Sequence, residues 1–157
     1  MRVFALLAWL GVIALPLVAH PNHDEADRAI KVVEPWARAT SPNAQTAAAY
    51  MVLWNRGATA DRLIAADSPA AERVEIHRSV ADGNRRRMVP LADGLALPPN
   101  QAETLQPGGT HLMFLGLKAG LAPGDHVLVT LSFEKAGPVT VEVAVKAIGH
   151  FQPTGHH

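Results

Sequence analysis

Four side chains able to bind a soft metal ion fall within one stretch of the chain, residues 73–113. They are His77, Met88, His111 and Met113. Thioether sulfur is a soft, uncharged ligand that suits Cu(I), whereas magnesium and calcium prefer oxygen, and copper also accepts imidazole. Residues 20–157 contain three methionines, and two of them belong to this set. Two imidazoles and two thioethers therefore predict a low-coordinate or tetrahedral Cu(I) site.

The spacing of these residues predicts that they meet on neighbouring strands. The sequence Ala81-Asp82-Gly83-Asn84 lies between the first two, and Asp-Gly flanked by extended segments favours a two-residue hairpin loop. With Asp-Gly as that loop, His77 lies directly opposite Met88, with the two Cβ atoms about 4.5–5.5 Å apart. His111 and Met113 are two residues apart in an apolar run, and residues i and i+2 of a strand share a face.

These four ligands are uncharged, so a bound ion would keep its full charge. Burying an unpaired charge is costly, and the site is therefore expected in a shallow, partly solvated position at the rim of the fold. A shallow site also suits a protein that passes its metal on. Methionine ligands have the further advantage that they cannot form disulfides in an oxidising compartment.

Other residues of similar type have simpler interpretations. Met51 lies in an all-apolar run and is predicted to fill the core. His126 follows a Pro-Gly-Asp turn and is predicted at the surface. The run Arg85-Arg86-Arg87 indicates either a charged edge strand that resists edge-to-edge pairing or a docking surface for an acidic partner. Histidines at the two ends of the chain indicate either polar termini or capture of Cu(II) or zinc; they are His20, His23, His150, His156 and His157.

The N-terminus has the pattern of an export signal. Met1-Arg2 is followed by an almost wholly apolar run to Ala19, which is typical of a secretory signal peptide. An uncleaved anchor is the alternative, although the run is slightly short for a span of about 20 residues. Removing residues 1–19 leaves 13 basic and 14 acidic residues, a net charge of −1 with His neutral, so nothing indicates a nucleic-acid partner.

The chain has no cysteine. That excludes disulfides, zinc–thiolate sites, a cysteine nucleophile and a blue-copper centre built on two histidines and a cysteine. Its stability must therefore come from the core, and 157 residues are enough for one domain with a real core.

Short apolar or alternating segments separated by turn signals follow the leader. They occupy residues 30–34, 48–54, 61–66, 73–80, 84–91, 95–97, 111–117, 126–133 and 139–145. Turn signals every eight to twelve residues or so predict an all-β sandwich or barrel of about eight to nine antiparallel strands. The predicted organisation is a signal peptide (1–19), a flexible leader (20–29), a copper-binding β-barrel domain (30–148) and a His-bearing C-terminal tail (149–157).

Taken together, these motifs resemble the periplasmic PCu(A)C-type copper chaperones. The signature of that family is a His, then a Met, then His-x-Met; here ten residues separate His77 from Met88 and twenty-two separate Met88 from His111. The resemblance covers residues 30–146. Its other matching segments are Ala48-Ala49-Tyr50, Asn55-Arg56-Gly57, Asp61-Arg62-Leu63, Val74-Glu75-Ile76-His77, 107–113 and 131–137.

The resemblance implies a cupredoxin-like Greek-key β-barrel that binds Cu(I) through His77, Met88, His111 and Met113. It also implies a periplasmic chaperone that delivers copper for assembly of the CuA centre of cytochrome c oxidase. The expected partner is then a CuA domain or a thiol-bearing assembly factor, with membrane contact only through the signal segment. No redox-tuning cysteine or obvious acid–base pair suggests an enzyme. Two alternatives are a copper-buffering resistance protein without a dedicated acceptor and a metal-free secreted β-sandwich that serves as an interaction domain.

Overall fold

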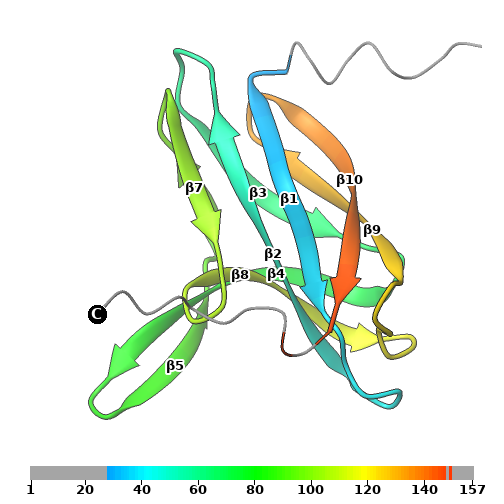
Figure 1. Cartoon of the computed structure of the whole chain (residues 1–157). Helices are drawn as coiled ribbons and strands as arrows, with labels where there is room; N and C mark the ends of the chain where they lie inside the picture. The colour runs from blue at the N-terminus through cyan, green and yellow to red at the C-terminus, as the bar shows by residue number, and fades with distance from the viewer. Residues whose placement is uncertain (1–27, 148, 150–157) are drawn as a thin grey trace, which may run out of the picture.

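The computed structural model describes residues 28–147 and 149, and that part is all-β (Figure 1). The predicted signal peptide, most of the leader and nearly all of the tail lie outside the described residues. The strands are β1 (Ile30–Arg38), β2 (Thr46–Asn55), β3 (Asp61–Asp67), β4 (Ala71–Asp82), β5 (Arg85–Pro90), β6 (Leu95–Leu97), β7 (Gln101–Leu105), β8 (Thr110–Leu117), β9 (His126–Phe133) and β10 (Gly137–Lys146). Within the described part, no helix is long and apolar enough to cross a membrane.

Seven of these strands close into a barrel. The hydrogen-bonded order runs β4-β8-β2-β1-β10-β9-β3, and β3 returns to β4 through the pair Ala66 and Val74. The other three strands are additions to this ring: β5 extends it beside β4, β6 pairs with β3, and β7 pairs with β2. A closed ring leaves few unpaired strand edges. It also places β4, which carries His77, next to β8, which carries His111.

The barrel interior is filled by the apolar residues that alternate along the strands. Ile76 on β4, Leu112 and Phe114 on β8, and Leu131 on β9 are all at most 6% exposed. Met51, predicted to fill the core, is 2% exposed. Because successive strand residues point to opposite faces, burying Ile76 and Leu112 turns the adjacent His77 and His111 to the outer side of the barrel wall.

Three details differ from the sequence prediction. The strand count is ten within the described residues, because Gln101–Leu105 pairs with β2 although its only buried residue is Leu105. The sheet is not wholly antiparallel, since β1 and β10 pair in parallel near residues 36–38. Pro35-Trp36 does not end β1; the strand continues past a register shift in which Glu34 adopts a φ of 47°.

Candidate metal centre

His77 and His111 come together through the pairing of β4 with β8. They are directly opposite each other in the antiparallel register, and their ring centres are 5.9 Å apart. The His77 side chain is 13% exposed and His111 is 3% exposed. Two imidazoles from distant parts of the sequence are therefore held next to each other in a mostly buried position, with their ring planes inclined by 62°.

The ring of His111 is fixed by its own loop. Its Nδ1 lies 3.1 Å from the carbonyl oxygen of Gly109, and since a carbonyl can only accept, Nδ1 is the protonated nitrogen. Burial lowers the pKa of His111, against the opposing effect of the hydrogen bond to Gly109 and with a smaller contribution from the nearby His77. The neutral ring then carries a lone pair on Nε2, the nitrogen that faces away from the loop.

The ring of His77 is fixed by a carboxylate on the same strand. Its Nε2 lies 2.8 Å from Oε2 of Glu75, and the other carboxylate oxygen accepts a 2.8 Å hydrogen bond from Nε of Arg73. The hydrogen bond from His77 holds the pKa of Glu75 below its usual range, and the bond from Arg73 acts in the same direction. Glu75 is therefore an anion that accepts a hydrogen bond from the Nε2–H group of His77 and leaves Nδ1 as the ring nitrogen without a partner.

Those two free nitrogens are buried and have no hydrogen-bond partner. In the part of the chain that the structure describes, only three buried side-chain nitrogen or oxygen atoms lack a partner: Nδ1 of His77, Nε2 of His111 and Nε of Arg38. An orphaned buried polar atom is rare and commonly marks the place of an ion or water. With metal–nitrogen distances of about 2 Å, two imidazoles that share an ion have ring centres at most about 6 Å apart, and the observed 5.9 Å meets that condition.

Met113 lies beside this pair on the same face of β8. It is opposite Glu75 on β4 and opposite Ala48 on β2, and it is partly buried. The register thus places its side chain on the side of the barrel wall that carries both histidines, next to the carboxylate that holds His77.

Met88 does not lie directly opposite His77, and that expectation was wrong. Asp82 pairs with Arg85, so the hairpin loop is Gly83-Asn84 rather than Asp82-Gly83. Gly83 takes the left-handed conformation, with φ of 60°, at the first position of the loop, which is where a type II′ turn requires glycine.

The new register changes the neighbour of Met88 but not its face. Met88 pairs with Ser79, and His77 pairs with Pro90. A slip of one residue would turn Met88 to the other face, whereas this displacement of two preserves it. Met88 is therefore a diagonal neighbour of His77, at a distance of about 7–8 Å in such pairs, and it is 54% exposed.

Oxygen and nitrogen ligands alone do not make a metal site here. Among the described residues, no group of three or more His, Asp or Glu side chains is placed to hold a metal ion. Met113 and Met88 are therefore the remaining candidates for further ligands beside His77 and His111.

An aromatic wall and Glu75 also belong to this site, and the sequence reasoning did not assign them to it. The ring of Tyr50 lies 6.4 Å from that of His111, Trp36 packs on Tyr50 at 4.7 Å, and Nζ of Lys146 lies 5.9 Å from the centre of the Trp36 ring. Burial raises the pKa of Tyr50, so it stays a neutral phenol. The alternation of side chains along residues 73–80 predicts that Glu75 and His77 share a face of the strand. Nothing in the sequence around them indicates the hydrogen bond between the two side chains.

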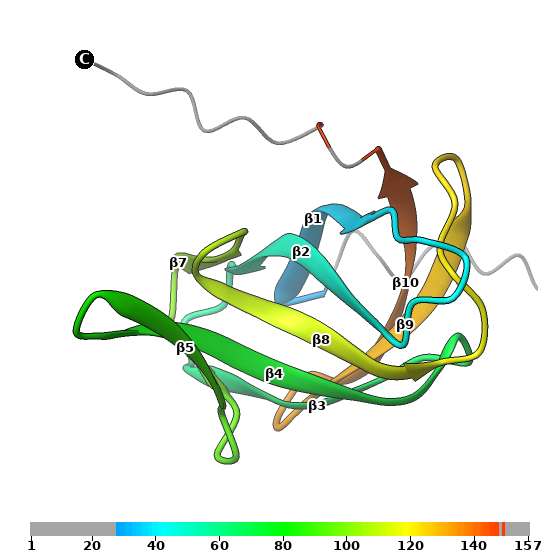
Figure 2. The same cartoon turned by 90° about the horizontal axis from the view of Figure 1, so that it is seen from below.

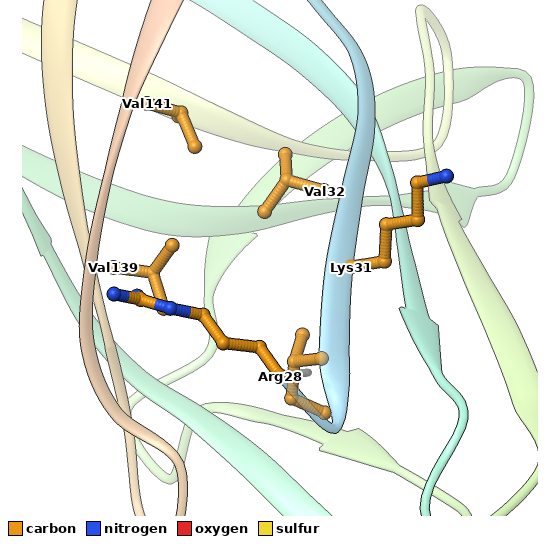
Figure 3. A pocket seen from close by; sticks show the side chains of 6 residues that line it. Arg28, Lys31, Val32, Val139 and Val141 are labelled. Carbon is orange, nitrogen blue, oxygen red and sulfur yellow. The ribbon is translucent and has the colours of Figure 1, made fainter. Parts of the chain in front are cut away.

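A hollow elsewhere in the fold is less suited to a metal. It measures about 90 Å³ and lies where β1 and β10 separate, with Val32, Val139 and Val141 facing the space between the strands (Figure 3). The remaining lining residues are Arg28, Ile30 and Lys31. Apolar side chains and two cations offer no metal ligand, so the pair of histidines remains the candidate centre.

The fold and this face of the barrel define a cupredoxin-like domain of the PCuAC type. A solved structure described as the copper-bound PCuAC domain from PmoF2 is 34% identical, with a TM-score of 0.64, over 76% of this chain and 93% of that domain. The apo PCuAC domain from PmoF1 is also 34% identical, with a TM-score of 0.63 and coverage of 76% and 94%. The Cu(I) form of DR1885 from Deinococcus radiodurans is 28% identical, with a TM-score of 0.61 and coverage of 77% and 82%.

The chain belongs to the LpqE-like family. The model of that family, described as "Putative lipoprotein LpqE-like", matches residues 30–145. The "Putative lipoprotein Lxx21020" of Leifsonia xyli subsp. xyli is 31% identical over 132 residues, which are 84% of this chain and 78% of that protein. The uncharacterized protein RP573 of Rickettsia prowazekii is 28% identical over 123 residues, 76% of this chain and 68% of that protein.

Proposed function

We propose that this protein is a periplasmic copper chaperone that binds one Cu(I) ion between His77 and His111. The observation that carries the proposal is the pair of buried ring nitrogens, Nδ1 of His77 and Nε2 of His111, that have no partner within the described structure. Related PCuAC domains have been solved with copper bound. Met113 and Met88 share the face of the two histidines and would supply the thioether ligands.

The chemistry of this donor set favours Cu(I). Neutral imidazoles and thioethers suit a soft monovalent ion and do not suit hard cations that need oxygen. The donors themselves add no charge, but the carboxylate of Glu75 lies one hydrogen bond behind His77, 2.8 Å from Nε2. That anion partly balances a bound cation, and the hydrogen bond keeps the other ring nitrogen free for the metal.

Met88 is the ligand through which copper would enter and leave. Its 54% exposure contrasts with the 3% exposure of His111, so an approaching acceptor meets this sulfur first. Transfer proceeds by ligand exchange: a thiolate or imidazole of the acceptor binds the ion as the Met88 thioether leaves. No electron is transferred, and no catalytic role is assigned to the protein.

The proposed place of action is the periplasm. The apolar N-terminal run suggests export, and a relative named as a lipoprotein suggests a protein of the cell envelope. The proposed destination of the copper is the CuA centre of cytochrome c oxidase, reached directly or through a thiol-bearing assembly factor. The terminal histidines would bind Cu(II) as a secondary capture site.

Competition titration with a Cu(I) chelator, combined with X-ray absorption of the loaded protein, tests the site. We expect one Cu(I) per chain with two sulfur and two nitrogen neighbours. Met88→Leu and Met113→Leu should each weaken binding, whereas Met51→Leu, a similar volume change at a core position 2% exposed, should leave affinity unchanged. Copper without sulfur neighbours, or equal affinity in all three variants, would remove the methionines from the assigned ligands. No measurable Cu(I) binding would favour a metal-free interaction domain.

A copper buffer without a dedicated acceptor would use the same site. Mixing the Cu(I)-loaded protein with a copper-free CuA domain separates the two roles. A chaperone loads the CuA domain faster than its copper dissociates to a chelator. A buffer loads the CuA domain only at that dissociation rate, because the domain then captures only copper that has already been released.

A further inference from the structure

The hairpin of residues 77–90, here called the basic hairpin, projects from the barrel. It is formed by the end of β4 and by β5, and both views show it extending away from the other strands (Figures 1 and 2). β5 is the edge strand of the sheet, and five of its six residues are exposed. The hairpin therefore offers a free strand edge and two accessible faces next to the candidate metal centre.

Charge is concentrated on this hairpin. It carries four arginines (Arg78, Arg85, Arg86 and Arg87) against one aspartate, Asp82, a net charge of +3 on a chain whose total is zero with His neutral. The remainder of the chain is consequently negative. Arg87 lies 3.8 Å from Asp82, but both side chains are about two-thirds exposed, so this ion pair is screened by solvent and leaves the positive field largely intact.

The positive field is held close to the exposed ligand. Arg86 donates from Nη2 to the Gly108 carbonyl at 2.6 Å and from Nε to Oγ of Ser79 at 3.0 Å. The bond to Gly108 joins the hairpin to the loop before β8, and the bond to Ser79 links the two strands of the hairpin. Met88 follows the three arginines directly in sequence, and neighbouring Cα atoms lie well inside the screening length of about 8 Å at physiological ionic strength.

We propose that the basic hairpin docks an acidic face of a copper-accepting protein and brings that acceptor onto Met88. This inference rests on the proposed function, since it names the partner surface of the same site. An acceptor must reach Met88 past the arginines, and a negative surface is the one that this field attracts and orients. Complementary charge acts mainly on the rate of encounter and on the choice of partner.

Charge on an edge strand also discourages self-pairing. If that were its whole purpose, the sign of the charge would not matter, since glutamates would repel a second copy equally well. A docking surface, in contrast, depends on the sign. Reversing the charge while keeping its magnitude therefore separates the two explanations.

The test compares two doubly reversed variants of the full chain. Arg85→Glu/Arg87→Glu reverses two exposed side chains of the hairpin and leaves the Arg86 hydrogen bonds in place. Lys31→Glu/Lys118→Glu makes the same change of net charge on exposed residues of β1 and of the chain after β8. Lys118 hydrogen bonds through its backbone to Ala70, at the end of β4 remote from the hairpin.

The first readout is NMR titration of the copper-free protein with a copper-free CuA domain. We expect the hairpin reversal to weaken binding by about tenfold or more at low ionic strength, and the control reversal to change it less than about threefold. Raising the salt should weaken the wild-type complex and have little effect on the hairpin variant. Equal affinity of the two variants, or no binding by the wild-type protein, overturns the docking proposal.

The second readout separates this proposal from the copper site itself. Equilibrium Cu(I) affinity is measured for the wild type and both variants. If all bind copper alike but the hairpin variant loads the CuA domain at the wild-type rate, docking by the hairpin is wrong and the copper site stands. If no form binds Cu(I), the proposed function fails, while the copper-free titration still decides whether the hairpin docks the acidic partner.

Discussion

His77 and His111 face each other across β4 and β8 with their ring centres 5.9 Å apart, and each ring has one nitrogen bound to the protein and one without a partner. Nε2 of His77 donates a hydrogen bond to the Glu75 carboxylate, and Nδ1 of His111 donates one to the Gly109 carbonyl. Both acceptors require a protonated nitrogen, so each fixes the tautomer that exposes a lone pair on the other side of its ring. Each ring therefore keeps one buried nitrogen available to the proposed copper ion.

Removing the free nitrogen of His111 should abolish most of the copper affinity without unfolding the protein. His111→Asn keeps an amide N–H where Nδ1 donates to Gly109 but has no atom equivalent to Nε2. Losing one ligand should reduce Cu(I) affinity by more than about tenfold, or about 1.4 kcal/mol. Copper-free stability should change by about 1 kcal/mol at most.

Competition titration and chemical denaturation of the same samples measure both quantities. His126→Asn is the matched control, because the His126 side chain is 55% exposed and far less constrained. Unchanged affinity in His111→Asn would show that Nε2 does not bind the ion.

Glu75 should act as a positioning residue for His77. Glu75→Ala removes the acceptor of the Nε2 proton and the nearby negative charge, and should weaken Cu(I) binding about tenfold, within the range usual for groups that orient a metal ligand. Glu75→Gln keeps an oxygen acceptor and should lose less. The ring ¹⁵N shifts of His77 report the tautomer directly: a change in Glu75→Ala is expected, and an unaltered tautomer together with lower affinity would assign Glu75 a purely electrostatic role.

Arg86 should matter to copper only through Met88. Arg86→Lys cannot form both the bond to Ser79 and the bond to Gly108, so the hairpin would be held less firmly beside the histidines. Cu(I) affinity should fall severalfold in the single variant. It should fall no further when Arg86→Lys is added to Met88→Leu, because two residues that act through one contact are not additive. Additive losses in this double-mutant cycle would show that Arg86 affects the ion independently of Met88.

Asp61 should stabilise the fold at neutral pH but not in acid. Burial alone would raise the pKa of Asp61, but backbone N–H groups of Lys135, Arg62 and Ala136 donate to its carboxylate and the net effect lowers the pKa. A group with a lowered folded-state pKa contributes stability above its unfolded pKa of about 3.9, and that contribution is lost as the pH falls through the folded value.

The corresponding experiment is urea denaturation of Asp61→Asn as a function of pH. The amide group of Asn can accept at only one of the two positions, so a loss of about 1 kcal/mol is expected at pH 7. The difference from wild type should shrink below pH 4 or so, where the wild-type carboxyl becomes protonated. Asp67→Asn, at an exposed position of the same strand, should be nearly neutral throughout, and a pH-independent effect of Asp61→Asn would contradict the ionic explanation.

Local pattern determined much of this protein. The alternation of Leu112 and Phe114 with His111 and Met113 requires only that the segment be a strand with one buried face, because side chains of a strand alternate with a period of two. The same alternation predicts that Ile76 points into the barrel core and that His77 points to the opposite face of the strand. The four-residue motif, read as a resemblance, indicated the PCuAC-type barrel, and the solved PCuAC domains confirm that fold.

Tertiary structure decided what periodicity leaves open. The hairpin register could move by two residues without changing which side chains are buried, so the hydrophobic pattern could not choose between Asp82-Gly83 and Gly83-Asn84 as the loop. The edge strand β7 was not predicted because its residues are mostly polar and exposed and show no apolar alternation. Its main-chain hydrogen bonds to β2 hold it in the sheet. His77 lies next to His111 only because β4 pairs with β8. The pairing of β4 with β8 results from closure of the whole barrel around one core, so no short stretch of sequence can predict it.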